Sequence, residues 1–313
     1  MITKNLLRYS DKWFPGGTPG VYVSRLVSAE GVVSELTQQP WVATATTSDE
    51  YLTVTVTRDA LAHVAVAVVQ AGNQCVTSDA LHGTTVCPAP PADLDNARDW
   101  ASARDALAAE FTTELAVAAG ATLHPPERQK ALRTSATERS LEKKVVADAI
   151  AYAGLDAVRF ALARTPPGGP APDPERIARH VLSNPAYAVR YAHAAAAAVL
   201  RWADKQPGEF RPGLLAEPGE LAQPEPTAQQ ELTLLDALSW LPERVAAAAR
   251  RGRPDQFTRY LEALASRTID TMSTTSYRVA GAIPSERLWL AEAARTGLAA
   301  GLGLLGITAP DRI

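Results

Sequence analysis

The chain has 313 residues and a formal net charge of −3 at pH 7, so we expect two domains and not the strong non-specific nucleic-acid binding of a basic protein. Apolar residues make up 46% and charged residues 21% of the sequence, which is typical of a globular protein with a sizeable core. No apolar run approaches the roughly 18 residues of a membrane helix, and the start lacks the layout of a signal peptide. We therefore expect a cytoplasmic protein with no membrane partner, whose Cys75 and Cys87 stay reduced.

The first part of the chain combines strand and helix patterns. Residues 50–57, EYLTVTVT, alternate apolar side chains with threonine, which predicts a strand with one buried face. Residues 58–72 carry apolar side chains at helical spacing and end at Gly72, which predicts a helix that stops there. We therefore predict a small α+β domain over residues 1–90.

From Asp93 onward strand patterns almost vanish, and the chain becomes rich in alanine at helical spacing. Residues 91–140 are predicted to form a helical connector. Residues 141–313 are predicted to form a bundle of about six or seven helices, with a break near Gly154. The expected fold class is mainly α, with a C-terminal helical bundle and a small N-terminal α+β domain.

One helix of this bundle carries an unusual surface. Residues 184–202, NPAYAVRYAHAAAAAVLRW, place Tyr187 and Tyr191 one helical turn apart, ahead of five consecutive alanines. Ser183 or Asn184 caps this helix, because a proline follows in its first turn. The two rings can stack on unpaired bases, or they can pack on a neighbouring helix with their hydroxyl groups satisfied. Both interpretations stay open at this point.

The sequence contains no recognisable catalytic constellation. Its five histidines are scattered, and none forms a pair at metal-ligand spacing. Its glycine clusters lack the strand-loop-helix context of a phosphate-binding loop, and no nucleophile elbow is present. We therefore expect a binding protein with no catalytic residues, no metal and no cofactor.

Four segments, in their order and spacing, resemble the C-terminal anticodon-binding domain of arginyl-tRNA synthetase. They are GLDAVRFALAR (154–164), NPAYAVRYAHA (184–194), LDALSWLPERVAAAA (235–249) and RLWLAEAARTGLAAGLGLLGITAPDRI (287–313). DAVR within the first segment resembles the motif that names the DALR domain. The resemblance covers about Leu141 to Ile313 and implies a DALR-type helical bundle. The strand at 50–57 resembles more loosely the end of the family's N-terminal additional domain, which touches the tRNA elbow.

The family's catalytic domain has no counterpart here. The stretch between Cys87 and Leu141 is too short for a nucleotide-binding fold, and no His-Ile-Gly-His-type or Lys-Met-Ser-Lys-type motif is present. The resemblance therefore implies a non-catalytic paralogue that binds a tRNA, of arginine type or of altered specificity, or another structured RNA. Alternatives are a protein-interaction scaffold that has lost RNA binding and a trans-acting subunit that supplies its domain to a synthetase-related protein. We expect no DNA partner.

The resemblance also implies where RNA would bind. In the family, the helix with the Asn-Pro-x-Tyr-x-x-x-Tyr-Ala-His pattern faces the anticodon loop. His193 in this pattern is predicted to be structural. The candidate RNA-binding residues are Asn184, Tyr187, Arg190, Tyr191, Arg250, Arg251, Arg312 and Ile313.

Two clusters of basic residues could supply phosphate contacts, although a solvated helical face explains either cluster as well. Their members are Arg128, Lys130, Arg133, Arg139, Lys143 and Lys144 in the first, and Arg244, Arg250, Arg251, Arg253 and Arg259 in the second.

Three departures from the family pattern concern the same expected surface. Ala195 stands where the family carries arginine, Thr271 and Met272 stand where it carries a Phe-Tyr pair, and Ile313 stands where it ends in methionine. If each lost contact contributes about 1–2 kcal/mol, reading of an arginine anticodon is weakened or changed.

Overall fold

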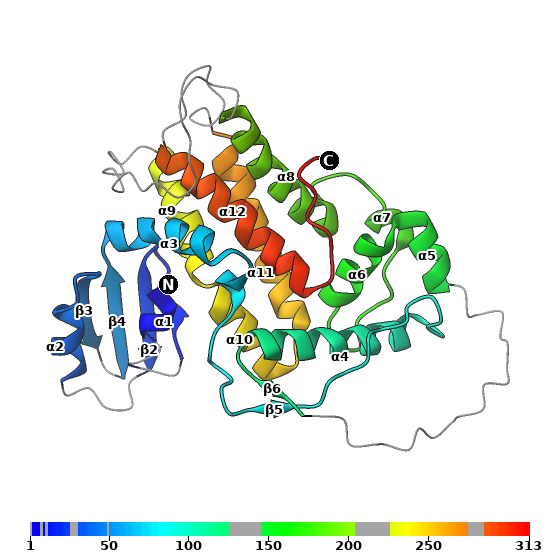
Figure 1. The fold of residues 1–313 in the computed structure, drawn as a ribbon, viewed down its shortest axis with the longest axis horizontal. Helices are drawn as coiled ribbons and strands as arrows, with labels where there is room; N and C mark the ends of the chain where they lie inside the picture. The colour runs from blue at the N-terminus through cyan, green and yellow to red at the C-terminus, as the bar shows by residue number, and fades with distance from the viewer. Residues whose placement is uncertain are drawn as a thin grey trace.

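The computed structural model describes residues 2–6, 9, 12–25, 31–48, 50–124, 145–203, 226–274 and 285–313. A small sheet lies at one side of a larger body of helices, and one long helix, α4 (Trp100–Ala118), runs along the lower edge of that body (Figure 1). Within the described residues, no helix combines the length and the apolar character needed to cross a bilayer.

The sheet is antiparallel, with strand order β1-β2-β4-β3. Its strands are β1 (Phe14–Pro15), β2 (Val21–Arg25), β3 (Val42–Ser48) and β4 (Tyr51–Val56), and the helices α1 (Ile2–Leu6) and α2 (Val32–Thr37) belong to the same region. The predicted strand at 50–57 is confirmed as β4, and Leu52, Val54 and Val56 are buried as the alternation requires.

The helix that follows the sheet is α3 (Arg58–Ala71), and a 3₁₀ turn, η1 (Gly72–Val76), continues it. The Thr57 hydroxyl caps its start by accepting from the Ala60 N–H. Gly72 ends it with a φ of 53°, a backbone angle that suits glycine. The predicted helix and its stop are confirmed.

The rest of the described chain is almost entirely helical. After α4 it contains α5 (Val145–Ala153), α6 (Leu155–Arg164), α7 (Pro174–Ile177), α8 (Pro185–Ala203), α9 (Pro226–Ser239), α10 (Leu241–Arg251), α11 (Pro254–Met272) and α12 (Ser285–Leu304). Gly154 separates α5 from α6 with a φ of 87°, which confirms the predicted break. The strands β5 (Thr85–Val86) and β6 (Thr122–Leu123) pair in parallel and are too short to leave an alternating pattern.

The core of the helical body lies where α8 packs against α11 and α12. Close approach of α11 and α12 requires glycine at Gly301, because a Cβ there would lie 2.5 Å from Leu261 Cδ2. The helix α3 also packs on α9 and α12, and the Gly20 N–H of the sheet region donates to Asp236 Oδ1 at 2.9 Å. The N-terminal region is thus joined to the helical body, and the domain boundaries near 90 and 140 stay a prediction.

Candidate nucleic-acid interface

The helix α8 starts at a turn that Asn184 holds in place. Its side chain is buried, and Nδ2 donates to the carbonyls of Ile177 at 2.8 Å and Arg179 at 2.7 Å. Its Oδ1 accepts from the Ala186 N–H at 3.2 Å, which is the bond expected of a helix cap. The same bonds tie the end of α7 to the start of α8. Asn184 therefore positions the helix, and its polar groups are already used.

An aromatic stack begins the exposed face of α8. The rings of Tyr187 and Tyr191 lie 5.9 Å apart between centroids, and His180 stacks on Tyr187 at 5.5 Å. Both tyrosines are half-buried. Neither hydroxyl has a hydrogen-bond partner among the described residues. The two phenols are thus open to a ligand, and the ring faces already belong to a stack that a further ring could extend.

A groove continues this face toward the C-terminal end of α8. It has a volume of about 350 Å³ and separates α8 from the last turn of α11. Ala195 and Met272 face it from the two helices, so the structure brings two of the three departures together. Trp202 stands at its end with 56% of its surface exposed. The full lining is Tyr191, Ala195, Ala198, Val199, Trp202, Ile269, Met272 and Ser273.

The alanine run of α8 serves two faces. Ala194, Ala196 and Ala197 are buried, which lets α8 approach α12 and α11 closely. Ala195 and Ala198 instead line the groove, where their short side chains leave space that an arginine would fill. The alanine run therefore allows close packing on one side of α8 and leaves the groove open on the other.

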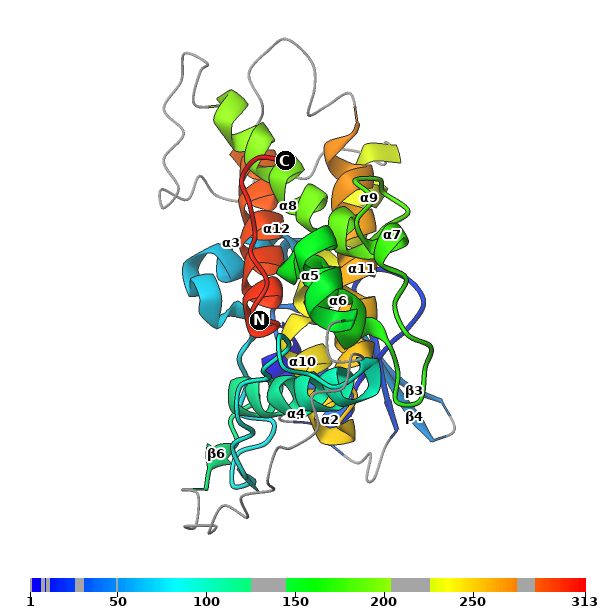
Figure 2. The same ribbon diagram turned by 90° about the vertical axis from the view of Figure 1, so that its right-hand side faces the viewer.

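The C-terminal tail after α12 lies along a neighbouring face of α8 (Figures 1 and 2). Arg190 reaches it, because its Nη2 lies 3.4 Å from Thr308 Oγ1 and 3.7 Å from Asp156 Oδ2. Asp156 in turn accepts from the backbone and the hydroxyl of Thr308. The candidate RNA contact Arg190 is thus already engaged in joining α6, α8 and the tail.

His193 fixes the next residues of the tail. It is buried, and its Nδ1 lies 2.9 Å from the carbonyl oxygen of Pro310, so the predicted structural role is confirmed. Arg201 Nη1 donates to the carbonyl of Asp311 at 2.6 Å. Arg312 and Ile313 follow, and both are exposed beside α8. These two candidates are therefore accessible at the end of the tail, next to the Arg201 end of α8.

We expect low pH to weaken the His193 contact. Burial is the main cause that lowers the pKa of His193 below 6.5, and it outweighs the opposing influence of the Pro310 carbonyl and of Asp311. Below about pH 6.5 His193 is protonated in the unfolded chain but stays neutral in the folded chain. The free energy of unfolding therefore decreases as the pH is lowered, until the lower pKa of His193 in the folded chain is reached. Urea unfolding between about pH 7.5 and about pH 5.5 should show a smaller decline for His193→Gln than for the wild type. Parallel declines would contradict this.

Two further candidates do not join this face. Arg251 Nη1 donates to Gln256 Oε1 near the start of α11, and Arg250 pairs with Glu243 at 2.6 Å. The groove contacts α11 at Ile269, thirteen residues further along, which is about 20 Å at ~1.5 Å per residue. Arg250 and Arg251 therefore belong to a different surface. The basic cluster at 128–144 lies outside the described residues.

Two aromatic residues of this surface, Trp202 and His180, were not among the candidates predicted from the sequence. Trp202 lies fifteen residues after Tyr187 in α8, on the same helical stripe, so continuing the period would have found it. His180 lies in the loop before α8, and no local pattern indicates its stacking.

Comparison with known proteins gives a family match that includes most of α8 and the tail. The family profile described as DALR anticodon binding domain matches residues 189–313, which begin within α8. The arginine–tRNA ligase of Micrococcus luteus is 36% identical over 180 residues, covering 53% of this chain and 30% of that protein. The enzyme of the same name from Renibacterium salmoninarum is 34% identical over 177 residues, with the same coverage. This chain thus spans about 30% of the length of these relatives.

A solved structure, the Thermus thermophilus arginyl-tRNA synthetase, covers 69% of this chain and 39% of its own length at 22% identity, with a TM-score of 0.40.

Proposed function

We propose that this chain, whose residues 189–313 form a DALR anticodon-binding domain, binds tRNA or another structured RNA through the exposed face of α8. The observation that carries the proposal is the stack of His180, Tyr187 and Tyr191, whose tyrosines are half-exposed and whose hydroxyl groups have no hydrogen-bond partner among the described residues. Unpaired bases of an RNA loop stack on such rings.

The proposed specificity differs from that of an arginine anticodon reader. Ala195 supplies no guanidinium to the groove, and Met272 supplies an apolar, adaptable side chain on the opposite wall. Stacking tolerates any base, whereas hydrogen bonds from a guanidinium distinguish bases. We therefore propose that this face selects an unpaired loop more than a particular anticodon.

The charges around this face support only a few phosphate contacts. Arg190 is engaged with Asp156, and Arg295 with Glu292, so among the arginines of α8, α12 and the tail Arg201 and Arg312 are the best placed for RNA. With about two contacts, the logarithm of the association constant should fall against the logarithm of salt concentration with a slope of only about −1 to −2.

Fluorescence anisotropy with the full chain and a labelled RNA stem-loop, from about 50 mM to about 200 mM salt, measures this slope. An arginine-type anticodon arm, the same arm with a changed loop, and a blunt duplex are the three ligands. We expect both loops to bind with similar affinity and the duplex to bind more weakly. Absence of binding at the lowest salt would contradict the proposed function.

A protein partner is the second candidate function, and the apolar lining of the groove is the observation that favours it. Trp202 is exposed and Ile269 half-buried at the groove, and together they offer an apolar surface that a partner helix could cover. A partner that is retained after RNase treatment would support this function over RNA binding. A co-purifying synthetase chain would identify it as a trans-acting subunit.

We also propose that the chain itself does not aminoacylate RNA. The residues between the N-terminal region and the DALR domain form α4 and short connecting segments in the described range 91–124, and the motifs for ATP binding are absent from the sequence. ATP–pyrophosphate exchange measured with arginine should stay at background.

A further inference from the structure

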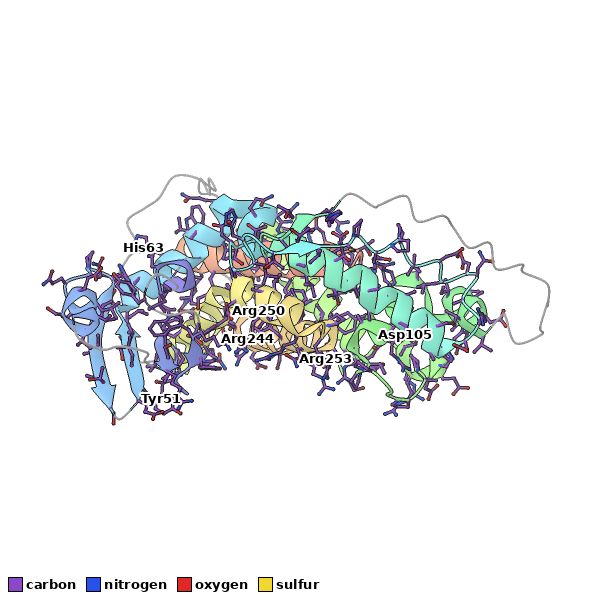
Figure 3. All side chains as sticks on the ribbon, turned by 90° about the horizontal axis from the view of Figure 1, so that it is seen from below. Tyr51, His63, Asp105, Arg244, Arg250 and Arg253 are labelled. Carbon is purple, nitrogen blue, oxygen red and sulfur yellow. The ribbon has the colours of Figure 1, made fainter. Side chains whose placement is uncertain are left out.

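A second concave site lies on a different face of α11 from the groove. It has a volume of about 330 Å³, within the range of small-ligand sites. The helices α10 and α11 form its two long walls, and Pro15 of β1 and Asp236 of α9 close it. Figure 3 looks onto this underside of the molecule, where Arg244, Arg250 and Arg253 are labelled.

Four arginines line this pocket, two from each helix. Arg244 and Arg251 lie seven residues apart on α10, and Arg259 and Arg267 lie eight apart on α11, so each pair shares one face of its helix. Asp236 is the acidic residue of the lining, and burial raises its pKa. The pocket therefore concentrates positive charge within a protein of net negative charge.

The four pocket arginines differ from the neighbouring arginines in their ion pairing. Arg250 is paired with Glu243 at 2.6 Å and Arg253 with Asp255 at 2.7 Å. Among the described residues, by contrast, none of the four pocket arginines lies within 4.0 Å of a carboxylate oxygen. Arg250 and Arg253 are thus each paired with a carboxylate at short range, whereas the carboxylate of Asp236 acts on Arg244 and Arg267 only from a longer distance.

Arg244 is the most constrained of the four. Its guanidinium lies 5.5 Å from the Trp240 ring and 5.9 Å from the Tyr260 ring, which hold it over their faces. Its Nε is buried and has no hydrogen-bond partner in the part of the chain that the structure describes. A buried donor without an acceptor is costly, and an anion in the pocket could relieve that cost.

We propose that this pocket binds a phosphate group, held by Arg244, Arg251, Arg259 and Arg267. Guanidinium forks match the geometry of phosphate oxygens, and several forks around one cavity favour a multiply charged anion. The phosphate belongs either to a free phosphorylated small molecule or to the backbone of an RNA. Its lining on α11 runs from Gln256 to Arg267, on a different face of that helix from Ile269 and Met272 of the groove, and the proposed phosphate binding does not depend on RNA binding at the groove.

Inorganic pyrophosphate is the probe for the free-ligand arm. Isothermal titration of the full chain at constant ionic strength should show binding, and Arg259→Gln with Arg267→Gln should weaken it by about tenfold or more, because charge-assisted hydrogen bonds are lost. Arg259 is exposed and Arg267 half-buried, so their replacement leaves the core intact. Arg58→Gln with Arg98→Gln, at two exposed positions outside the pocket lining, is the matched loss of two charges and should leave pyrophosphate affinity unchanged.

Protection of the pocket from phenylglyoxal provides a second measurement. Mass spectrometry should show that pyrophosphate protects arginines of α10 and α11 from modification while Arg98 still reacts. This readout uses the wild-type chain, so it does not depend on whether a variant folds. Absence of pyrophosphate binding, or equal binding by the double variant, would overturn the proposal.

The RNA arm identifies the source of the phosphate. If the double variant binds a stem-loop RNA more weakly than the wild type does, and pyrophosphate competes with that RNA for the wild type, the pocket holds the RNA backbone. If RNA binding is unchanged or absent while pyrophosphate binds the wild type, the ligand is a free phosphorylated molecule. If pyrophosphate binds and no RNA binding is detected at all, the proposed function is refuted while the proposed phosphate site is supported.

Discussion

Replacing Arg159 with methionine is expected to lower the free energy of unfolding by about 3–5 kcal/mol, because the change leaves a buried carboxylate without its cation. Arg159 Nη2 lies 2.5 Å from Glu110 Oε1, and the two side chains are only 12% and 16% exposed. The guanidinium also lies 5.0 Å from the centroid of the Phe111 ring. Urea unfolding of the two proteins gives the difference directly.

An exposed ion pair in the same molecule is the matched control. The side chains of Arg25 and Glu50 are 71% and 65% exposed, so Arg25→Met should cost no more than about 1 kcal/mol. Replacing both Arg159 and Glu110 with apolar residues should recover much of the loss, since no charge then remains buried alone. A cost below about 1 kcal/mol for Arg159→Met would show that burial does not dominate this pair.

Arg159 also links the fold to the candidate interface. Its Nε donates to the carbonyl of Leu305 at 3.1 Å, just after α12 ends. Gly306 follows with a φ of 59°, and a Cβ there would lie 2.6 Å from Arg159 Nη2. The tail can therefore turn toward α8 only because glycine stands beside this guanidinium. Loss of Arg159 should loosen the tail as well as the contact with α4.

The sequence was sufficient where neighbouring residues decide the structure. Alternation over 50–57 predicted β4, helical spacing up to Gly72 predicted α3, and Asn184 ahead of a proline predicted the start of α8. In each case the side-chain pattern or the cap lies within a few residues of the backbone it controls.

Contacts between distant segments could not be predicted in the same way. Asp156 and Arg159 lie three residues apart on α6, at the spacing of an ion pair within one helix. Instead Asp156 binds Thr308 and lies near Arg190, while Arg159 binds Glu110. Helical spacing shows that two side chains share a face, but it does not show which charged groups of other helices approach that face.

The candidate site divides along the same line. The family pattern predicted that Ala195 and Met272 concern one surface, and the groove between α8 and α11 joins them. Arg250 and Arg251 belong to a run of basic residues in the sequence. The turn at Gly252 places that run at the start of α11, away from the groove at the other end of the helix. A run of charge does not indicate which face of the fold will carry it.

Replacing Tyr187 and Tyr191 together with leucine is expected to weaken RNA binding by about a hundredfold or more, since each base–aromatic stack contributes about 1–3 kcal/mol. Leucine keeps an apolar side chain at both half-buried positions, so the packing of α8 should change little. The salt dependence should stay the same, because no cation is removed. Anisotropy titrations at two salt concentrations separate the affinity from the slope.

The control is Tyr152→Leu on α5, where an exposed tyrosine has no ring partner among the described residues. It should bind RNA as the wild type does. If the double variant also retains full affinity, the stack of Tyr187 on Tyr191 and His180 serves packing alone, and the RNA face must lie elsewhere. If affinity falls and the salt slope falls with it, the tyrosines act by positioning Arg190 and the tail. A loss of affinity at constant slope is the outcome that only direct stacking on bases explains.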